Sequence, residues 1–418
     1  MTEQIITGID LGSSKIATLI AKLSDNDKEP RIMGFSSVSS HGVKKGQIVD
    51  INQVTEATES SVEKAERMAG IKIQSAYASI GGPHIESINS HGIVAVSNPD
   101  GEITVEDVNR AIDAARAISL SSTREVIEVS AREYIVDGQG GIKNPVGMSG
   151  VRLEVNTHII TASATNLKNL DRCLSDLGID NRGALFSGLA SSMAVLSDTE
   201  KELGVALIDI GGGKTDVCIY VDGALSYSAS IPLGARHITN DIAVGLRVSL
   251  ESAEKIKHFL SQSKLNDSKE EISIEKLNIE EAPQKISPKT VIDGIIRPRL
   301  EEIFEQVLAE IEKSEYLTVI PSGSVICGGG AQTVGTVEAA KRVIGLPARI
   351  GRPQGITGLV DEVLYPQHAT GVGLLLYGVN DVDEAQKIDF KKFDKILKNL
   401  SFKQSYKKVV DLFKSFIP

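Results

Sequence analysis

Two short segments of the chain combine the residue types that bind phosphate groups and a divalent cation. Glycines let backbone N–H groups approach an anion without hindrance from a Cβ atom, and successive N–H groups in a turn form a concave phosphate site. Lysine adds a positive charge, serine or threonine adds a hydroxyl, and aspartate can order the water shell of Mg²⁺. The segments contain Asp10, Gly12, Ser13, Ser14 and Lys15, and Asp209, Gly211, Gly212, Gly213, Lys214 and Thr215.

A β-hairpin, rather than a P-loop, is expected around the second segment. The triplet Gly213-Lys214-Thr215 matches the end of a P-loop, but the P-loop spacing requires glycine at position 208, which is Ile208, and a helix afterwards. The apolar run Val205–Ile210 precedes the glycines, and a second β-rich run, Val217–Val221, follows them. One such hairpin is weak evidence of a ligand site, since many glycine turns only require a positive φ.

The first segment repeats the pattern of the second. In each copy an apolar run ends in aspartate, and a glycine and then a lysine follow at the same spacing. Such a repeat suggests a duplicated domain, with the phosphates of a nucleotide between the two copies. The matched pairs are Asp10 with Asp209, Gly12 with Gly211 and Lys15 with Lys214.

Three further segments extend the pattern. A third glycine turn, Gly328–Gly330, follows an apolar run and precedes a helical pattern over Val337–Val343, a geometry that lets a flat ring or a ribose pack on the backbone. The segments Ser187–Val195 and Ala369–Leu375 are rich in small residues and are expected to be helices that pack closely, as a hinge between the two halves.

In this order, the five segments resemble the phosphate-1, connect-1, phosphate-2, adenosine and connect-2 motifs of the actin/heat-shock-70/sugar-kinase superfamily. Over residues 5–380 the chain most closely resembles the FtsA family of bacterial cell-division proteins within it, also through Gly188-Leu189-Ala190-Ser191 and Pro298-Arg299. The resemblance implies an α/β fold: duplicated actin-like, ribonuclease-H-like domains around a nucleotide cleft, with a small inserted α+β module.

The resemblance also implies roles for the residues of the motifs. Asp10 and Asp209 would order Mg²⁺ through water, the two hairpins would hold the phosphates of ATP, and Gly328, Gly329 and Gly330 would hold the nucleoside. Hydrolytic members carry Gln or Glu in connect-1, whereas the matching residue here is Ser187, a poor general base. We therefore name no catalytic residue and expect slow ATP hydrolysis or none.

Changes in the pattern of predicted helices and strands divide the chain into parts. Helices are expected over residues 54–68, 167–177, 250–260 and 291–311. A further helix is expected to start near Thr104, with Asp107 in a capping box. Separate strands are expected at 126–129, 134–136, 151–155 and 158–161. The predicted parts are 1–83 with 163–195 (core domain I, 1A), 84–162 (the module, 1C), 196–235 with 313–380 (core domain II, 2A), 236–312 (an insertion, 2B), the linker 381–400 and the amphipathic helix 401–418.

Two sites in the predicted insertion 2B have alternative interpretations. Glu254 and Lys257 stand one helical turn apart, which fits a solvated ion pair worth a few tenths of a kcal/mol; in the superfamily, a Glu-x-x-Lys pair at this place holds adenine and ribose. Arg299 matches an arginine on the FtsA surface that binds the tubulin-like protein FtsZ, and the alternative is a plain exposed charge.

The end of the sequence predicts a basic amphipathic helix. Aromatic and aliphatic residues recur at helical spacing with lysines on or beside the other side, a combination suited to insertion into anionic lipid. The alternative is docking of the same helix against its own core. The residues are Phe402, Lys403, Tyr406, Lys407, Val409, Val410, Phe413, Phe416 and Ile417. One such helix should bind reversibly, and a polymer carrying many would bind by avidity.

Composition limits the partners. The net charge of −10 argues against general nucleic-acid binding. Cys173, Cys218 and Cys327 show no metal-ligand spacing and are expected in the core. No apolar run reaches the ~18 residues needed to span a bilayer, and the first residues lack the features of a signal peptide.

The resemblance thus implies an actin-like ATP-binding protein that self-assembles on the cytoplasmic face of the cell membrane at the division site, as a peripheral protein, and tethers FtsZ, as in the FtsA family. Alternatives are a scaffold like the pilus-assembly protein PilM, or a small-molecule kinase of the same superfamily with Asp216 as its base.

Overall fold

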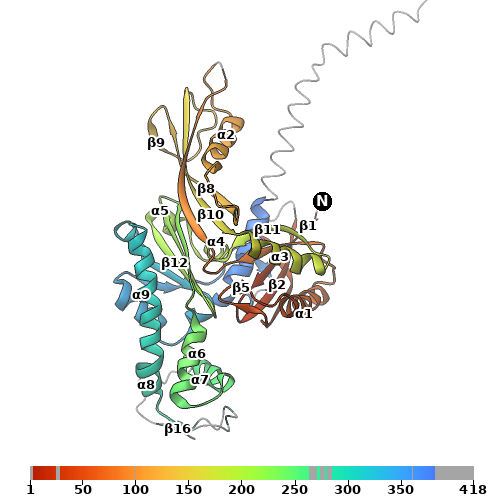
Figure 1. Ribbon diagram of the computed structural model, residues 1–418, viewed down its shortest axis with the longest axis vertical. Helices are drawn as coiled ribbons and strands as arrows, with labels where there is room; N and C mark the ends of the chain where they lie inside the picture. Colours follow the sequence, from red (N-terminus) through yellow and green to blue (C-terminus); the bar gives the residue numbers. More distant parts are fainter. Residues whose placement is uncertain are drawn as a thin grey trace, which may run out of the picture. The chain divides into compact units, whose positions relative to one another are not determined.

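The computed structural model describes residues 3–24, 29–98, 100–262, 271–273, 277, 279, 285–359 and 361–381 (Figure 1). The chain divides into two units, Met1–Leu376 and Tyr377–Pro418. Nearly all of the second unit, including the predicted amphipathic helix 401–418, lies outside the described residues. The elements below belong to the first unit.

The first sheet is built around the first hairpin. Strands β1, β2 and β3 are antiparallel neighbours, and β6 and β11 extend the sheet on the β1 side in parallel. Helix α1 (Ile51–Ala69) packs on β2 and β3 and ends at Gly70, whose φ of 71° is easily adopted by glycine. The sheet order is β11 (Asp180–Phe186), β6 (Ser75–Ile80), β1 (Glu3–Leu11), β2 (Lys15–Ser24), β3 (Arg31–Ser39) and β19 (Thr357–Gly358).

The second sheet repeats this topology around the second hairpin. Two antiparallel pairings join β12, β13 and β14, and two parallel pairings join β12, β17 and β18, in the same sequence of neighbours as in the first sheet. The repetition confirms the predicted duplication. The order is β14 (Ala224–Ile231), β13 (Thr215–Val221), β12 (Val205–Ile210), β17 (Ser324–Cys327) and β18 (Ala348–Ile350).

Two helices of small residues lie close together, as predicted. Helix α4 occupies Ser187–Val195, and another helix begins at residue 369. A Cβ atom built on Gly373 would lie 1.7 Å from the carbonyl oxygen of Ala190, so only glycine permits this backbone approach. Gly8 and Gly371 also bring the second helix close to the first sheet, because Cβ atoms at these positions would lie 2.9 Å from Leu374 and 2.5 Å from Leu19.

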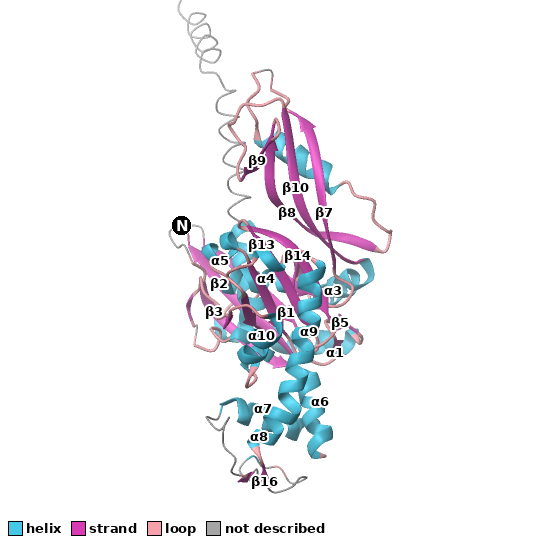
Figure 2. Cartoon of the chain, turned by 90° about the vertical axis from the view of Figure 1, so that its left-hand side faces the viewer, coloured by secondary structure: helices cyan, strands magenta, loops and turns pink. Residues whose placement is uncertain are grey.

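The inserted module is a four-stranded antiparallel sheet with helix α2 (Val105–Arg116) packed on it (Figure 2). The helix begins at Thr104 in a capping box with Asp107, as predicted. The four short strands predicted at 126–129, 134–136, 151–155 and 158–161 form only two long ones, whose register shifts at irregularities. The strand order is β7 (Glu86–Ala95), β10 (Arg152–Ser163), β8 (Arg124–Val136) and β9 (Gln139–Ile142).

The predicted helix 291–311 is interrupted. It starts as α8 (Pro288–Val291), passes through a π-helical turn, η2 (Ile292–Ile296), and continues as α9 (Arg297–Lys313). Pro298 lacks an N–H and cannot make the regular helical bond, which accounts for the wider turn before it. Helices α6 (Ala235–Leu246) and α7 (Leu250–Gln262) and strand β16 (Lys285–Ile286) share a buried core with this helix, and β15 (Ile272–Ser273) pairs with β16.

Smaller elements complete the first unit. Strand β19, which the sequence assigned to core domain II, pairs instead with β3 of the first sheet, so the chain returns to core domain I before residue 380.

Cys173, Cys218 and Cys327 are buried and free, as predicted. The small elements are β4 (Val43–Lys44), β5 (Gln47–Ile48), α3 (Ala164–Asp176), α5 (Asp198–Leu203), η3 (Leu317–Val319), η4 (Gly329–Gln332), α10 (Thr336–Ile344) and η5 (Pro366–His368).

Candidate functional site

A cavity of about 110 Å³ lies where the two hairpins face each other. It combines both predicted phosphate segments with the third glycine turn and the first residue of α4. Its lining is Asp10, Leu11, Gly12, Ser13, Ser14, Lys15, Ser79, Gly81, Ser187, Asp209, Gly211, Gly212, Gly213, Lys214, Gly328, Gly329, Gln367 and Thr370. Segments that stand almost 200 residues apart in the sequence therefore form one site, as the repeat predicted.

Glycine is required where the hairpins meet. A Cβ atom on Gly212 would lie 2.8 Å from the Ser14 Oγ, and one on Gly213 would lie 2.9 Å from the Ser13 Oγ. The Ser13 Oγ also accepts a hydrogen bond of 2.9 Å from the N–H of Gly46. Any larger side chain at either glycine would push the two halves of the site apart.

Two carboxylates are buried in the cavity wall. Asp10 accepts a hydrogen bond from the Ser79 Oγ at 2.8 Å, and Asp209 accepts bonds from the Ser191 Oγ at 2.5 Å and the Thr370 Oγ1 at 3.3 Å. Burial raises the pKa of Asp10, and burial followed by the charge of Asp216 raises the pKa of Asp209 to about 6. Buried carboxylates with raised pKa values are stabilised by any cation that enters.

Two lysines stand at the same cavity with different partners. The Lys15 Nζ lies 2.9 Å from Nδ1 of His368. Burial lowers the pKa of Lys15 to about 8, against the opposing charges of Asp10 and Asp209. Burial and Lys15 together lower the pKa of His368 to about 3, so its imidazole is neutral and Nδ1 can accept a hydrogen bond from the lysine ammonium.

The second lysine belongs to a buried ion pair. The Lys214 Nζ contacts Asp216 and lies 2.5 Å from the Ser187 Oγ, which donates to Asp216 at 2.8 Å. Ser187, the connect-1 residue, therefore has its proton directed to a carboxylate. That arrangement leaves its hydroxyl oxygen as an acceptor for lysine, not as a base toward the cavity.

Not every predicted ligand lines the cavity. The Thr215 side chain is fully buried and donates to the carbonyl of Leu233, so its hydroxyl is not available to a ligand. Gly330 is buried behind Gly328 and Gly329, where a Cβ atom would meet Ile210.

The two insertion sites are engaged within the chain. The Lys257 Nζ bonds Glu254 at 2.7 Å and the Thr239 Oγ1 at 2.8 Å, so the ion pair expected from the spacing is present. It is not the solvated pair that was expected, because only 9% of the Lys257 side chain is exposed. Neither residue lines the cavity. A role of the pair in holding adenine stays a prediction. Arg299 bonds Asp241 at 2.5 Å and also contacts Glu302, while 24% of its side chain stays exposed.

Sequence reasoning missed several residues around the cavity. Ser79 lies near the end of β6 and Gly81 directly follows this strand. Because β6 is parallel to β1, a strand ending beside Asp10 could have indicated both residues. Gln367 and His368 lie in η5, and no motif of the sequence pointed to this turn. Gln367 brings an amide to the wall, where its Nε2 lies 3.1 Å from Nε2 of His368.

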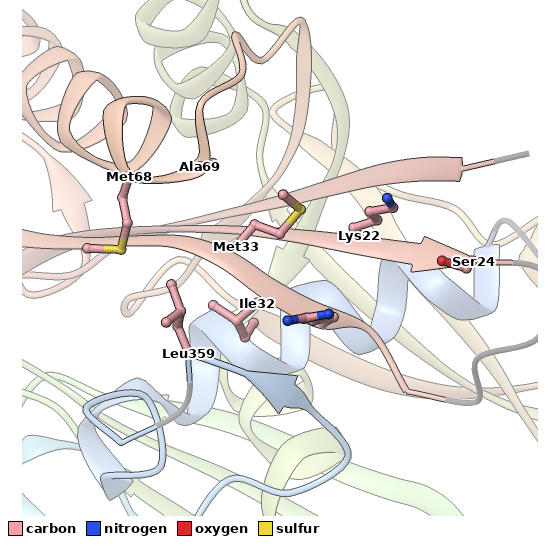
Figure 3. A pocket seen from close by; sticks show the side chains of 8 residues that line it. Lys22, Ser24, Ile32, Met33, Met68, Ala69 and Leu359 are labelled. Atoms are coloured by element: carbon pink, nitrogen blue, oxygen red, sulfur yellow. The ribbon is translucent and has the colours of Figure 1, made fainter.

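A second, larger hollow has a different character. It measures about 480 Å³ and lies along β3, the end of α1 and β19, where the side chains of Met33, Met68 and Leu359 surround it (Figure 3). Its lining lacks the glycine turns and paired carboxylates of the smaller cavity. We therefore take the smaller cavity, and not this hollow, as the candidate site for a phosphate ligand.

Two family models match the chain. The model described as "SHS2 domain inserted in FTSA" matches residues 82–161, and the model described as "Cell division protein FtsA" matches residues 206–373. The first agrees closely with the predicted module 84–162.

Curated relatives match along nearly the whole chain. Cell division protein FtsA of Borreliella burgdorferi is 39% identical, over 95% of this chain and 94% of its own. FtsA of Pseudomonas aeruginosa is 37% identical (90% and 89%), and FtsA of Bacillus subtilis is 35% identical (96% and 90%).

Solved structures show the fold at lower identity. A chain of the PilM-PilN type IV pilus biogenesis complex matches with a TM-score of 0.64 at 15% identity, over 90% of this chain and 98% of that chain. MreB5 of Spiroplasma citri, solved with AMPPNP, matches with a TM-score of 0.52 at 13% identity, over 93% and 98%. These likenesses confirm the predicted actin-like fold class.

The lowered pKa of Lys15 predicts a pH dependence of ligand binding. In the ligand-free protein its ammonium is charged below pH 8 and loses its proton as the pH rises through that value. A bound polyphosphate needs the charged form, so the affinity for Mg-ATP should fall about tenfold between pH 7 and pH 9, one pKa unit above the midpoint. Titration calorimetry across this range measures it.

The matched control is Lys15→Arg, whose guanidinium stays charged throughout. Its affinity should change much less than that of the wild type over the same range. An identical pH profile in both proteins would show that Lys15 does not control the dependence.

Proposed function

Because this chain belongs to the FtsA family of cell-division proteins, we propose that it binds Mg-ATP in the cavity, self-assembles on the cytoplasmic face of the membrane at the division site, and tethers the tubulin-like protein FtsZ there. The single observation that supports nucleotide binding is the meeting of two glycine hairpins, each with an aspartate and a lysine, around one cavity.

The charges of the cavity fit a magnesium nucleotide. Asp10 and Asp209 are buried oxygen donors with raised pKa values, the kind of group that holds Mg²⁺ directly or through its waters. Bound Mg²⁺ would supply charge neutralisation for the phosphates. The chain itself offers Lys15, Lys214 and the backbone N–H groups of both glycine turns to the phosphate oxygens.

The nucleoside would lie toward the third glycine turn. Gly328 and Gly329 line the cavity, and Gly328 has a φ of 82° that suits glycine. Glu254 and Lys257, already paired on α7, are proposed to contact the ribose or adenine edge from the insertion. Nucleotide would then bridge the two sheets and favour one arrangement of the two halves.

Hydrolysis should be slow. The connect-1 residue Ser187 is hydrogen-bonded to Asp216 and cannot act as an efficient base toward an attacking water. Asp216 itself is fully buried and is not part of the cavity lining, which disfavours the alternative of a small-molecule kinase with this residue as its base.

Phosphate release from Mg-ATP by the full chain should therefore proceed far more slowly than the ~1–100 s⁻¹ typical of kinases. A coupled phosphate assay at saturating Mg-ATP measures this rate. Turnover within the kinase range would contradict the proposal that nucleotide acts mainly as a structural ligand.

Membrane attachment is proposed for the segment 401–418, which lies outside the described residues. Among the described residues, the structure has no helix that is both long and apolar enough to cross a bilayer. The proposed attachment rests on the aromatic residues and lysines that the sequence places at helical spacing, from Phe402 to Ile417.

Arg299 is proposed as part of the FtsZ-binding surface, since part of its side chain stays exposed beside its two carboxylate partners.

Vesicle co-sedimentation tests the attachment. With Mg-ATP present, the full chain should pellet with vesicles that contain anionic lipid, whereas a chain ending at Leu400 should stay in the supernatant. Neutral vesicles are the control, because lysine attraction to anionic lipid contributes ~1 kcal/mol per residue near the surface. If neither chain pellets with anionic lipid, the tether fails and a scaffold like PilM becomes the better interpretation.

A further inference from the structure

Asp216 connects the cavity to strand β14. Its Oδ2 accepts from Lys214 and from the Ser187 Oγ, and its Oδ1 accepts from the Ser230 Oγ at 2.6 Å. Ser230 in turn accepts a bond of 3.3 Å from the N–H of Gly82, the residue at which the inserted module starts. A fully buried carboxylate thus stands between a cavity lysine and the beginning of the module.

The module rests on the same strand through polar contacts. The Ser87 Oγ donates to the carbonyl of Ser228 at 2.7 Å, and His158 Nε2 lies 3.0 Å from the Ser228 Oγ. Farther along β14, Arg132 donates to the Ser226 Oγ at 3.2 Å. The module is therefore seated on core domain II, although the chain enters it from core domain I.

His84 is the unexplained residue at this junction. It lies between β6 and β7, where Arg124 donates to its carbonyl at 3.0 Å. Within the described part of the chain, neither of its buried ring nitrogens has a hydrogen-bond partner. Burial, Arg124 and Lys214 lower the pKa of His84 to about 4, while Asp216 acts in the opposite direction, so a neutral ring stands in the field of the Lys214–Asp216 pair.

We propose that His84 is the second partner of Asp216: when a phosphate group in the cavity draws Lys214 away, Asp216 accepts a hydrogen bond from the His84 ring, and nucleotide binding is thereby coupled to the seat of the module. This inference rests on the proposed nucleotide binding. His84 is a positioning residue, since it acts on the ligand only through Asp216 and Lys214.

The hydrogen bond from His84 is expected because Asp216 loses its counter-charge when Lys214 moves to a phosphate group. Lys214 lines the cavity and its side chain is 13% exposed, so phosphate can reach it, whereas the Asp216 side chain is 1% exposed. Removing one member of a buried ion pair leaves an uncompensated charge, which is strongly unfavourable. An imidazole N–H that has no partner among the described residues offers the compensation without breaking another bond.

The test is a double-mutant cycle on nucleotide affinity in the full chain, with Mg-AMP-PNP as the ligand. His84→Ala should weaken binding about tenfold, within the ~5- to 150-fold range of coupling between sites. His84→Gln, which keeps a side-chain N–H, should restore most of the affinity. In an Asp216→Asn background, His84→Ala should have little effect, because no buried carboxylate then needs the ring.

Ser226→Ala is the matched control, because it removes a contact between β14 and the module that does not involve Asp216. Its affinity should stay within twofold of the wild type. Hydrogen exchange of residues 82–92 is the second readout: AMP-PNP should change it in the wild type and in Ser226→Ala, but not in His84→Ala.

The outcomes separate the two levels of the proposal. The role of His84 would be overturned if His84→Ala lost the same affinity in the wild type and in the Asp216→Asn background, or lost none in either. Nucleotide binding by the wild type would still stand. A wild type that binds no AMP-PNP would overturn the proposed function together with this inference.

Discussion

Burial of four charges in one small cavity is the constraint on which the structure depends. Asp10, Asp209, Lys15 and Lys214 all stand where the two hairpins meet, and burial shifts the pKa of three of them toward the neutral form. Isolated buried charges are costly, so each is held by hydroxyls, an imidazole or an opposite charge. A magnesium polyphosphate would supply the missing counter-charges: a cation for the carboxylates and an anion for the lysines.

The duplicated sheets and the small-residue helices follow from that constraint. In each sheet, an aspartate stands one residue before the end of a central strand and lines the cavity, as do the glycines that follow it. The two halves can meet only because glycines replace side chains at Gly212, Gly213 and Gly373. The residues that hold the charges and those that allow close packing are therefore equally needed for the site.

Patterns with a local physical cause could be predicted from the sequence. The hairpin strands, the capped helix after Thr104 and the helix Ser187–Val195 rest on alternation, capping or helical spacing within a few residues. The repeat of Asp10 and Asp209 could also predict one shared cavity.

What the sequence did not yield depends on contacts between distant segments. In the module, the pairing of β8 with β10 continues through register shifts, so the four predicted short strands form two long ones. Strand β19 belongs to the first sheet because it pairs with β3. The burial of Thr215, the presence of Gln367 in the wall and the ion pairs of Arg299 arise from neighbours far along the chain. No local pattern marks such neighbours. The membrane role of residues 401–418 stays a prediction.

If Asp10 and Asp209 hold Mg²⁺ for the nucleotide as proposed, these two carboxylates should make nucleotide binding depend on magnesium. The most direct measurement is calorimetric titration of ATP into the full chain, with and without Mg²⁺, for the wild type and for the double variant Asp10→Asn/Asp209→Asn. We expect Mg²⁺ to strengthen binding by the wild type and to have no effect on the variant, which should bind free ATP at least as well because two negative charges are gone. A variant that keeps the full magnesium effect would contradict the assignment.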